Sequence, residues 1–163
     1  MSKVGRLGLI GGLALVAAVV LAAAGHGSSL AKRQGVVIQI TAKDTDPGLG
    51  TGTFKLIAGP GTLDADRGTV SYAEGIYRQG IEAGQSFELG RGTDMLTGKA
   101  GTLVIRRNDR LVSAGPYQVV TGPWTVVGGT GVYAGVRGGG RHAAVGRPSG
   151  STYVQYEGVL TTP

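Results

Sequence analysis

Hydrophobic residues alternate with polar residues along most of the chain after residue 31. Val36, Ile38 and Ile40, each separated by one residue, are a clear example. A period of two places successive side chains on opposite faces of a β-strand, and no segment keeps the 3.6-residue period of an amphipathic helix. The pattern predicts strands over residues 36–41, 52–57, 68–77, 81–89, 101–107, 111–114, 117–127, 132–137 and 153–160.

The segments between these strands are short and rich in turn-forming residues. Residues 64–68, 108–109 and 146–150 predict turns, and residues 90–99 predict a longer loop. Gly122-Pro123 predicts a bend within the long strand, because proline cannot donate to a sheet ladder.

Eight or so antiparallel strands leave two architectures open, a closed barrel and a two-sheet sandwich. Glycine makes up 32 of the 163 residues. Glycine relieves crowding where a small barrel coils sharply, and closure removes exposed sheet edges. We therefore expect an all-β protein whose single domain, residues 32–163, is a closed antiparallel eight-stranded barrel.

A glycine-rich stretch extends from Val126 to Gly140. Residues 128–131 suit a tight turn, because glycine adopts positive φ without a Cβ clash. The alternation that follows predicts a strand with Tyr133 and Arg137 on one face. The stretch also fits the G-x-G-x-x-A pattern of dinucleotide-binding proteins, but no helix can follow it, so we expect no nucleotide cofactor.

The same stretch resembles the signature of the dirigent proteins. The likeness lies in Val126-Val127-Gly128-Gly129-Thr130-Gly131, then Tyr133 and Arg137-Gly138, and the strand pattern fits over residues 117–162. Allene oxide cyclases share that barrel fold and carry a related glycine-rich turn and aromatic residue. The resemblance implies a calycin-like barrel of the dirigent/allene oxide cyclase type, in those families commonly assembled as a homotrimer.

The resemblance also implies a function. In dirigent proteins the arginine that corresponds to Arg137 lines a pocket that orients phenoxy radicals made by a separate oxidase. A small apolar or aromatic ligand in the barrel interior is therefore expected, without a redox centre of the protein's own. Gly131, Tyr133 and Arg137 are carried over as site residues.

Aromatic residues in the predicted strands are further candidates for the ligand site. Trp124 and Tyr156 are chosen as ligand-binding residues, although such rings equally suit a packed core or a subunit interface. A hollow barrel predicts a cavity of roughly 300 Å³ or more, lined by Tyr133 and Arg137. If Arg137 points inward it needs a carboxylate partner, because an unpaired buried charge is costly. The available carboxylates are those of Glu74, Glu82, Glu88 and Asp94.

Three functions remain open on the sequence. The first is a dirigent-like barrel that binds a small apolar or aromatic molecule. The second is a cofactor-free isomerase or cyclase of the allene oxide cyclase type, in which an inward carboxylate and Arg137 stabilise developing charge. The third is a solid barrel with a structural or envelope-interaction role.

Residues 1–31 have the features of an export signal. Lys3 and Arg6 precede an uncharged apolar run over residues 7–24, and small residues suitable for cleavage follow. The run is also about long enough to span a bilayer, so an uncleaved N-terminal anchor is the alternative. Either form predicts a secreted or extracytoplasmic domain, with membrane contact only through this segment.

Composition argues against several kinds of chemistry. The chain has no cysteine, so it has neither disulfides nor a thiol site. From residue 32 on, 14 basic residues outnumber 10 acidic ones, but they are scattered except at residues 106–110, which we interpret as a solvated turn. Interleaved aromatic residues are missing there, so we expect no nucleic-acid partner.

His142 is the only histidine after residue 31. We expect it at an exposed position of a strand or bulge, and no G-x-S-x-G elbow accompanies it, so neither a Ser-His-Asp site nor a zinc site is expected. Asp44-Thr45-Asp46 and Asp64-Ala65-Asp66 begin like calcium loops but lack the later ligands. We expect these carboxylates to accept backbone N–H groups, and we expect no metal and no cofactor.

Overall fold

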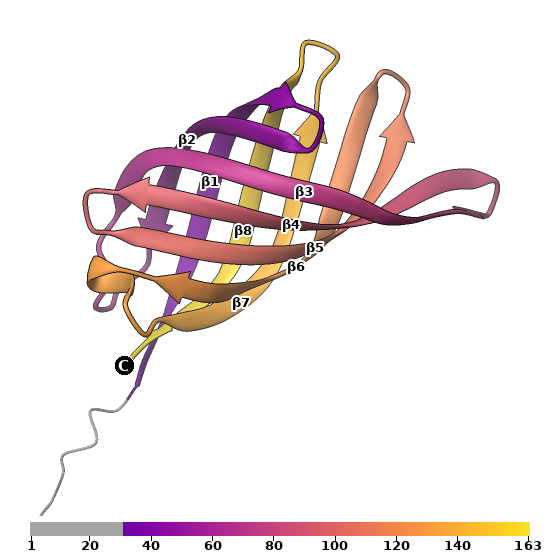
Figure 1. Cartoon of the computed structure of the whole chain (residues 1–163). Helices are drawn as coiled ribbons and strands as arrows, with labels where there is room; N and C mark the ends of the chain where they lie inside the picture. The colour runs from indigo at the N-terminus through magenta and orange to yellow at the C-terminus, as the bar shows by residue number, and fades with distance from the viewer. Residues whose placement is uncertain (1–30) are drawn as a thin grey trace, which may run out of the picture.

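Eight antiparallel strands close into a barrel in the computed structural model, which describes residues 31–163 (Figure 1). The order of the strands around the barrel is their order along the chain, so the predicted closed barrel is confirmed. The expected export signal lies outside the described residues apart from Ala31. The strands are β1 Lys32–Asp46, β2 Leu49–Ala58, β3 Asp66–Glu82, β4 Gln85–Gly98, β5 Thr102–Ala114, β6 Tyr117–Gly129, β7 Arg137–Gly146 and β8 Ser151–Thr162.

The first and last strands close the barrel. β1 pairs with β2 on one side and with β8 on the other, where the register runs from Lys32 opposite Thr162 to Lys43 opposite Ser151.

Within residues 31–163, no helix has the length and apolar character needed to cross a membrane.

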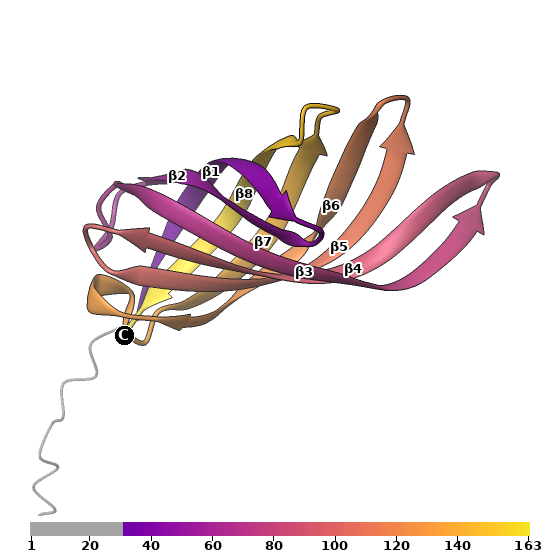
Figure 2. The same ribbon diagram turned by 45° about the horizontal axis from the view of Figure 1, so that its top comes forward.

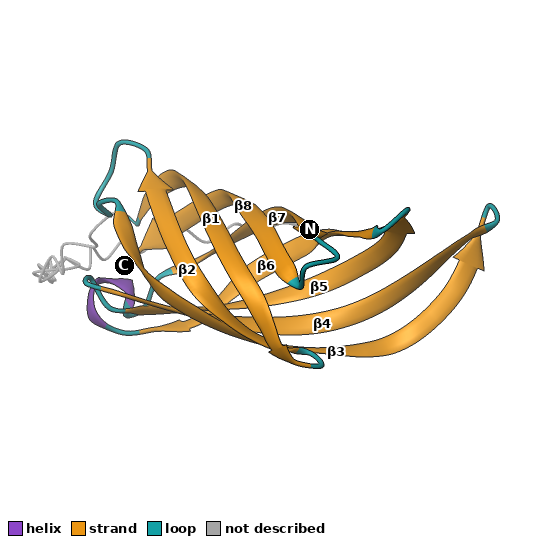
Figure 3. Ribbon diagram, turned by 90° about the horizontal axis from the view of Figure 1, so that it is seen from above, coloured by secondary structure: helices purple, strands orange, loops and turns teal. Residues whose placement is uncertain are grey.

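The two ends of the barrel differ. The closed end carries residue 31, the C-terminus, the 59–65 connection and η1, a 3-10 turn over Gly131–Tyr133. The open end carries the four hairpin turns at residues 47–48, 83–84, 115–116 and 147–150. There the β3–β4 hairpin extends beyond the rest of the sheet, and the tips of the hairpins diverge (Figures 2 and 3).

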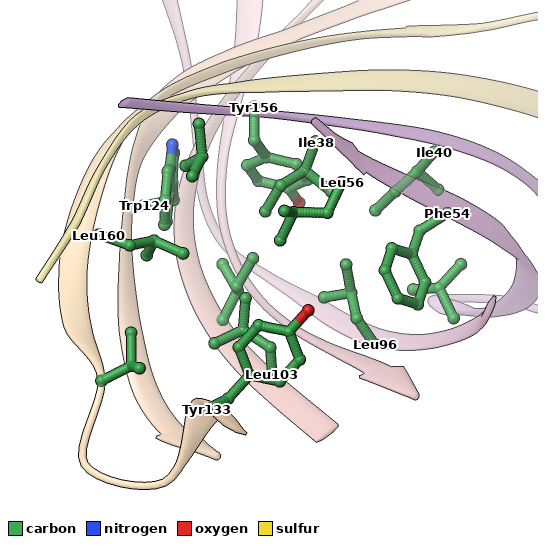
Figure 4. Close-up of a cluster of buried hydrophobic side chains, with 14 of the residues drawn as sticks. Ile38, Ile40, Phe54, Leu56, Leu96, Leu103, Trp124, Tyr133, Tyr156 and Leu160 are labelled. Carbon is green, nitrogen blue, oxygen red and sulfur yellow. The ribbon is translucent and has the colours of Figure 1, made fainter. Parts of the chain in front are cut away.

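The hydrophobic core fills the barrel from the closed end to its middle (Figure 4). Alternation along β1 points Val36, Ile38 and Ile40 inward, as the sequence predicts, and each is buried. Leu56, Leu103 and Trp124 meet them from other strands. Burying such side chains stabilises the fold by about 1.5–3 kcal/mol each relative to leaving them exposed.

Asp66 and Tyr133 seal the closed end. The Tyr133 hydroxyl donates to Oδ2 of Asp66 at 3.0 Å, and the backbone amides of Arg67, Lys99 and Ala100 donate to the same carboxylate at 2.8, 3.2 and 3.4 Å. The prediction that the Asp66 carboxylate accepts backbone N–H groups is confirmed.

β4 and β5 follow a different course from the one predicted. Residues 90–98 belong to β4 and not to a loop, residues 81–89 contain the 83–84 hairpin turn, and residues 106–110 continue β5. The reason is that the inward positions here are polar or glycine. Gly92 and Asp94 in β4, with Arg107 in β5, are buried but break the apolar alternation.

The glycine-rich stretch is also arranged differently from the prediction. Gly131–Tyr133 forms η1 in place of the start of a strand, and β7 begins only at Arg137. Gly131 has a φ of 60° and Gly135 a φ of 74°, so positive φ recurs along this segment. Tyr133 is buried whereas Arg137 is exposed, so the two side chains do not share a face.

Candidate functional site

A cavity of about 70 Å³ occupies the interior on the open-end side of the core. It is smaller than the sequence-based expectation, and neither Tyr133 nor Arg137 lines it. Part of its wall is aliphatic and consists of Ile40, Val70, Leu111, Val120, Ala144 and Val154. Charged and polar side chains from every strand except β2 complete the lining, so the interior changes from apolar to polar at this level.

Arg107 is the centre of the polar part. Its Nε donates to Oδ1 of Asp94 at 3.1 Å, and one terminal nitrogen donates to Oε2 of Glu74 at 2.8 Å. The other terminal nitrogen donates to Oδ2 of Asp109, which lies two residues along β5 and therefore on the same face. The arginine side chain is only 9% exposed, so three carboxylates hold one buried guanidinium.

Gly92 makes room for this guanidinium. A Cβ at this position would lie 2.5 Å from Cζ of Arg107, well inside van der Waals contact. The glycine in β4 therefore allows the arginine of the neighbouring strand to lie flat against the sheet.

The charge of Arg107 is set by two opposing effects. Burial alone lowers the pKa of Arg107, but the negative charges of Asp94 and Asp109 outweigh it and raise the pKa above its usual value. The guanidinium therefore stays charged at any pH at which the protein is folded, and it needs its carboxylates.

His142 lies beside this cluster on β7 and is buried, with 1% of its side chain exposed. The prediction of an exposed His142 was wrong, because the inward positions of β7 include this residue and Ala144. Nε2 lies 3.1 Å from Oδ1 of Asp109, but the two groups are not aligned as a hydrogen bond. Among the described residues, neither ring nitrogen has a hydrogen-bond partner, and neither has Oδ1 of Asp109.

Tyr156 supports the cluster from the core side. Its hydroxyl donates to Oδ2 of Asp94, and its ring lies 5.3 Å from that of His142 and 5.8 Å from that of Trp124, measured between centroids. Burial, with the nearby charge of Asp94, raises the pKa of Tyr156 well above its usual value. The tyrosine therefore remains a neutral hydrogen-bond donor.

Tyr72 and Asp44 stand nearer the open end. The Tyr72 hydroxyl donates to Oδ1 of Asp44, and the ring lies 5.9 Å from Cζ of Arg107. Burial, together with the hydrogen bond to Asp44, raises the pKa of Tyr72. Both hydroxyl donors that face the carboxylates, those of Tyr72 and Tyr156, are thus already engaged.

None of the five residues chosen from the sequence lines the cavity. Gly131, Tyr133 and Arg137 lie at the closed end, whereas Trp124 and Tyr156 are packed in the core below the cavity. Sequence reasoning missed Arg107, Asp109 and His142. The spacing of Arg107 and Asp109, two residues apart in a strand, is a signal that could have placed both on one face, but it does not extend to His142.

The carboxylates of the cluster face a guanidinium in place of a metal. Among residues 31–163, no group of three or more histidine, cysteine, aspartate or glutamate side chains is placed to hold a metal ion. Among the described residues, Oδ1 of Asp109 has no hydrogen-bond partner, so the arrangement suits a group that donates hydrogen bonds.

Comparison with known proteins adds no assignment to this geometry. No family model matches the sequence, and no curated protein matches it. The class that the fold and the site define is a closed eight-stranded barrel with a buried arginine–carboxylate cluster beneath an open mouth.

Proposed function

We propose that the protein is an exported barrel that binds a small, largely apolar or aromatic molecule in the open half of its interior, as the likeness to dirigent proteins implies. The observation that carries the proposal is the cavity beyond the packed core, with aliphatic walls and a charged cluster at one side. A fully packed structural barrel would have no reason to keep charged side chains and unpartnered buried nitrogens at this level.

The size of the cavity defines how such a ligand is held. Pockets that enclose a whole drug-sized ligand measure about 300–1,000 Å³. A cavity of about 70 Å³ accommodates only one end of such a molecule. We infer that the polar end enters the cavity and that the apolar body rests in the mouth, between the hairpins of the open end.

The test compares two alanines of β7 that face opposite sides of the sheet. Ala144 lines the cavity, whereas its neighbour Ala143 is exposed on the outer surface. We expect the neutral dye N-phenyl-1-naphthylamine to gain fluorescence on binding to the native protein and to the Ala143→Leu variant. Ala144→Leu fills the cavity, and we expect it to weaken dye binding about tenfold or more, since added volume blocks the head of the ligand.

Circular dichroism and urea unfolding of both variants would establish that the barrel is retained. Absence of a fluorescence gain with the native protein, or equal binding by the two variants, would contradict an interior binding site.

A further inference from the structure

We propose that the ligand is a cation, specifically an apolar or aromatic amine whose ammonium group lies against His142 and Glu74. This inference rests on the proposed function and specifies the chemical class of its ligand.

The charge balance is negative. Asp44, Glu74 and Asp94 line the cavity with Arg107, so three carboxylates face one guanidinium. Asp109 borders an adjoining void of about 10 Å³ and adds a fourth carboxylate within contact of the same guanidinium. The four carboxylates and the guanidinium carry a net charge of −3 (−4 + 1) when all four carboxylates are ionised. An uncompensated charge at a partly buried site is costly, and a bound cation relieves that cost.

Arg107, Tyr72 and Tyr156 together present seven N–H and O–H groups, and five of these donate to carboxylates. Every guanidinium nitrogen of Arg107 donates to a carboxylate, and the hydroxyls of Tyr72 and Tyr156 donate to Asp44 and Asp94. The remaining polar lining residues, Gln118 and Thr152, lie near the open-end termini of β6 and β8.

Acceptors remain unused. The two ring nitrogens of His142, one of which is an acceptor in a neutral imidazole, have no partner among the described residues. The side chain lines the cavity, and only 1% of it is exposed. Glu74 bonds the arginine through Oε2 and is partly exposed to the mouth, with 36% of its side chain accessible. A group with several donors and no acceptor therefore fits, and an alkylammonium has three donors and no acceptor.

The aliphatic walls determine the rest of the molecule. Val70, Leu111, Val120 and Val154 surround the polar groups with hydrocarbon. A hydrated inorganic cation would gain nothing from contact with hydrocarbon. No group of three or more histidine, cysteine, aspartate or glutamate side chains is placed to hold a metal ion among residues 31–163. An organic amine satisfies both the acceptors and the walls.

The experiment measures displacement of N-phenyl-1-naphthylamine by three benzene derivatives of similar size and different charge: benzylamine, benzyl alcohol and benzoate. At pH 7 we expect benzylamine to bind about tenfold or more tightly than benzyl alcohol, because a partly buried opposite charge contributes on the order of 1.4 kcal/mol. Benzoate should bind most weakly of the three.

Two variants with the same change of net charge locate the effect. Glu74→Gln should lower the affinity for benzylamine about fivefold or more and leave that for benzyl alcohol unchanged. Glu157→Gln, which removes a carboxylate from the exposed outer face of β8, should leave both affinities unchanged.

The outcomes separate this inference from the proposed function. If the dye binds but benzylamine and benzyl alcohol compete equally, or benzoate competes best, or none of the three competes, the cationic ligand is wrong and the binding cavity stands. If Glu74→Gln and Glu157→Gln have equal effects, the amine is not at this site. If the dye itself does not bind, the proposed function fails and this inference fails with it.

Discussion

Arg107 is the residue on which the interior depends most directly. It is buried and holds Asp94, Asp109 and Glu74 together from three strands. An arginine in this position offsets the cost of placing several carboxylates inside a barrel. Without it, the carboxylates would repel one another in a site with little water.

Replacing Arg107 with methionine tests this role. The side chain keeps a comparable volume but leaves buried carboxylates unpaired, so we expect a loss of about 3–5 kcal/mol in the free energy of unfolding. Urea unfolding at pH 7 measures it. The matched control is Arg106→Met, since Arg106 is the exposed neighbour on the outer face and should change stability by less than about 0.5 kcal/mol. Equal effects of the two changes would show that the cluster contributes nothing to stability.

Three tyrosine hydroxyls predict how stability responds to alkaline pH. Burial raises the pKa of Tyr72, Tyr133 and Tyr156 above the ordinary value of about 10, and a neighbouring aspartate raises each pKa further. The folded state therefore holds these protons more tightly than the unfolded state. Their contribution is complete below about pH 10 and is lost as the pH rises above it.

We thus expect the free energy of unfolding to fall between about pH 10 and pH 11.5. Denaturant unfolding at a series of pH values measures it. The Tyr156→Phe variant should fall less steeply over the same range, because it lacks one of the shifted hydroxyls. A native slope no steeper than that of the variant would contradict the assignment of the effect to Tyr156.

Single residues of the site were only partly predictable from the sequence. Glu74 and Asp94 were named as carboxylates that could pair with an inward arginine, and both contact one, but the arginine is Arg107. The sequence could not identify this arginine, because the choice depends on which alternate residues of each strand point into the barrel. Where the inward residues are polar, no apolar alternation shows which residues these are.

At the scale of single elements, β4 and β5 form a pair adapted to hold a charge. Gly92 in β4 lies against Arg107 in β5, and the two residues are directly opposite in the register. A strand glycine is normally destabilising, since it has no side chain to pack. Here its lack of a side chain is what gives the guanidinium its space.

We expect Gly92→Ala to destabilise the protein by about 1–3 kcal/mol, because the added methyl group would displace Arg107 from its carboxylates. Thermal and urea unfolding measure the change. Gly75→Ala is the matched control, since a Cβ on Gly75 of β3 would meet nothing within 4 Å. Were both changes to have the same effect, the role assigned to Gly92 would be wrong.

Elements with apolar inward faces were predicted well, and those with polar inward faces were not. β1 was recognised from Val36, Ile38 and Ile40, whereas the inward side of β4 offers Gly90, Gly92 and Asp94 and was predicted as a loop. Glycine and aspartate normally indicate turns. They are accommodated in a long strand here because the neighbouring strands supply the ladder of backbone hydrogen bonds.

At the scale of the whole molecule, the high glycine content correctly indicated closure. Added Cβ atoms at Gly140 and Gly158 would lie 2.7 Å from Cα of Gly158 and from Cζ2 of Trp124, respectively. Glycine in these strands thus relieves crowding inside the small barrel, as expected from the sequence. The division of the interior into a packed half and a charged half was not predictable, because it depends on strand register.

The seam between β1 and β8 has a consequence for how the polypeptide is made. Every other pairing joins strands that follow one another, so it can form as the chain leaves the ribosome. The seam pairs Lys32 with Thr162, so it can form only after the last strand has been synthesised. Until then the nascent chain is an open sheet with two free edges, and these edges are exposed to pairing with other chains.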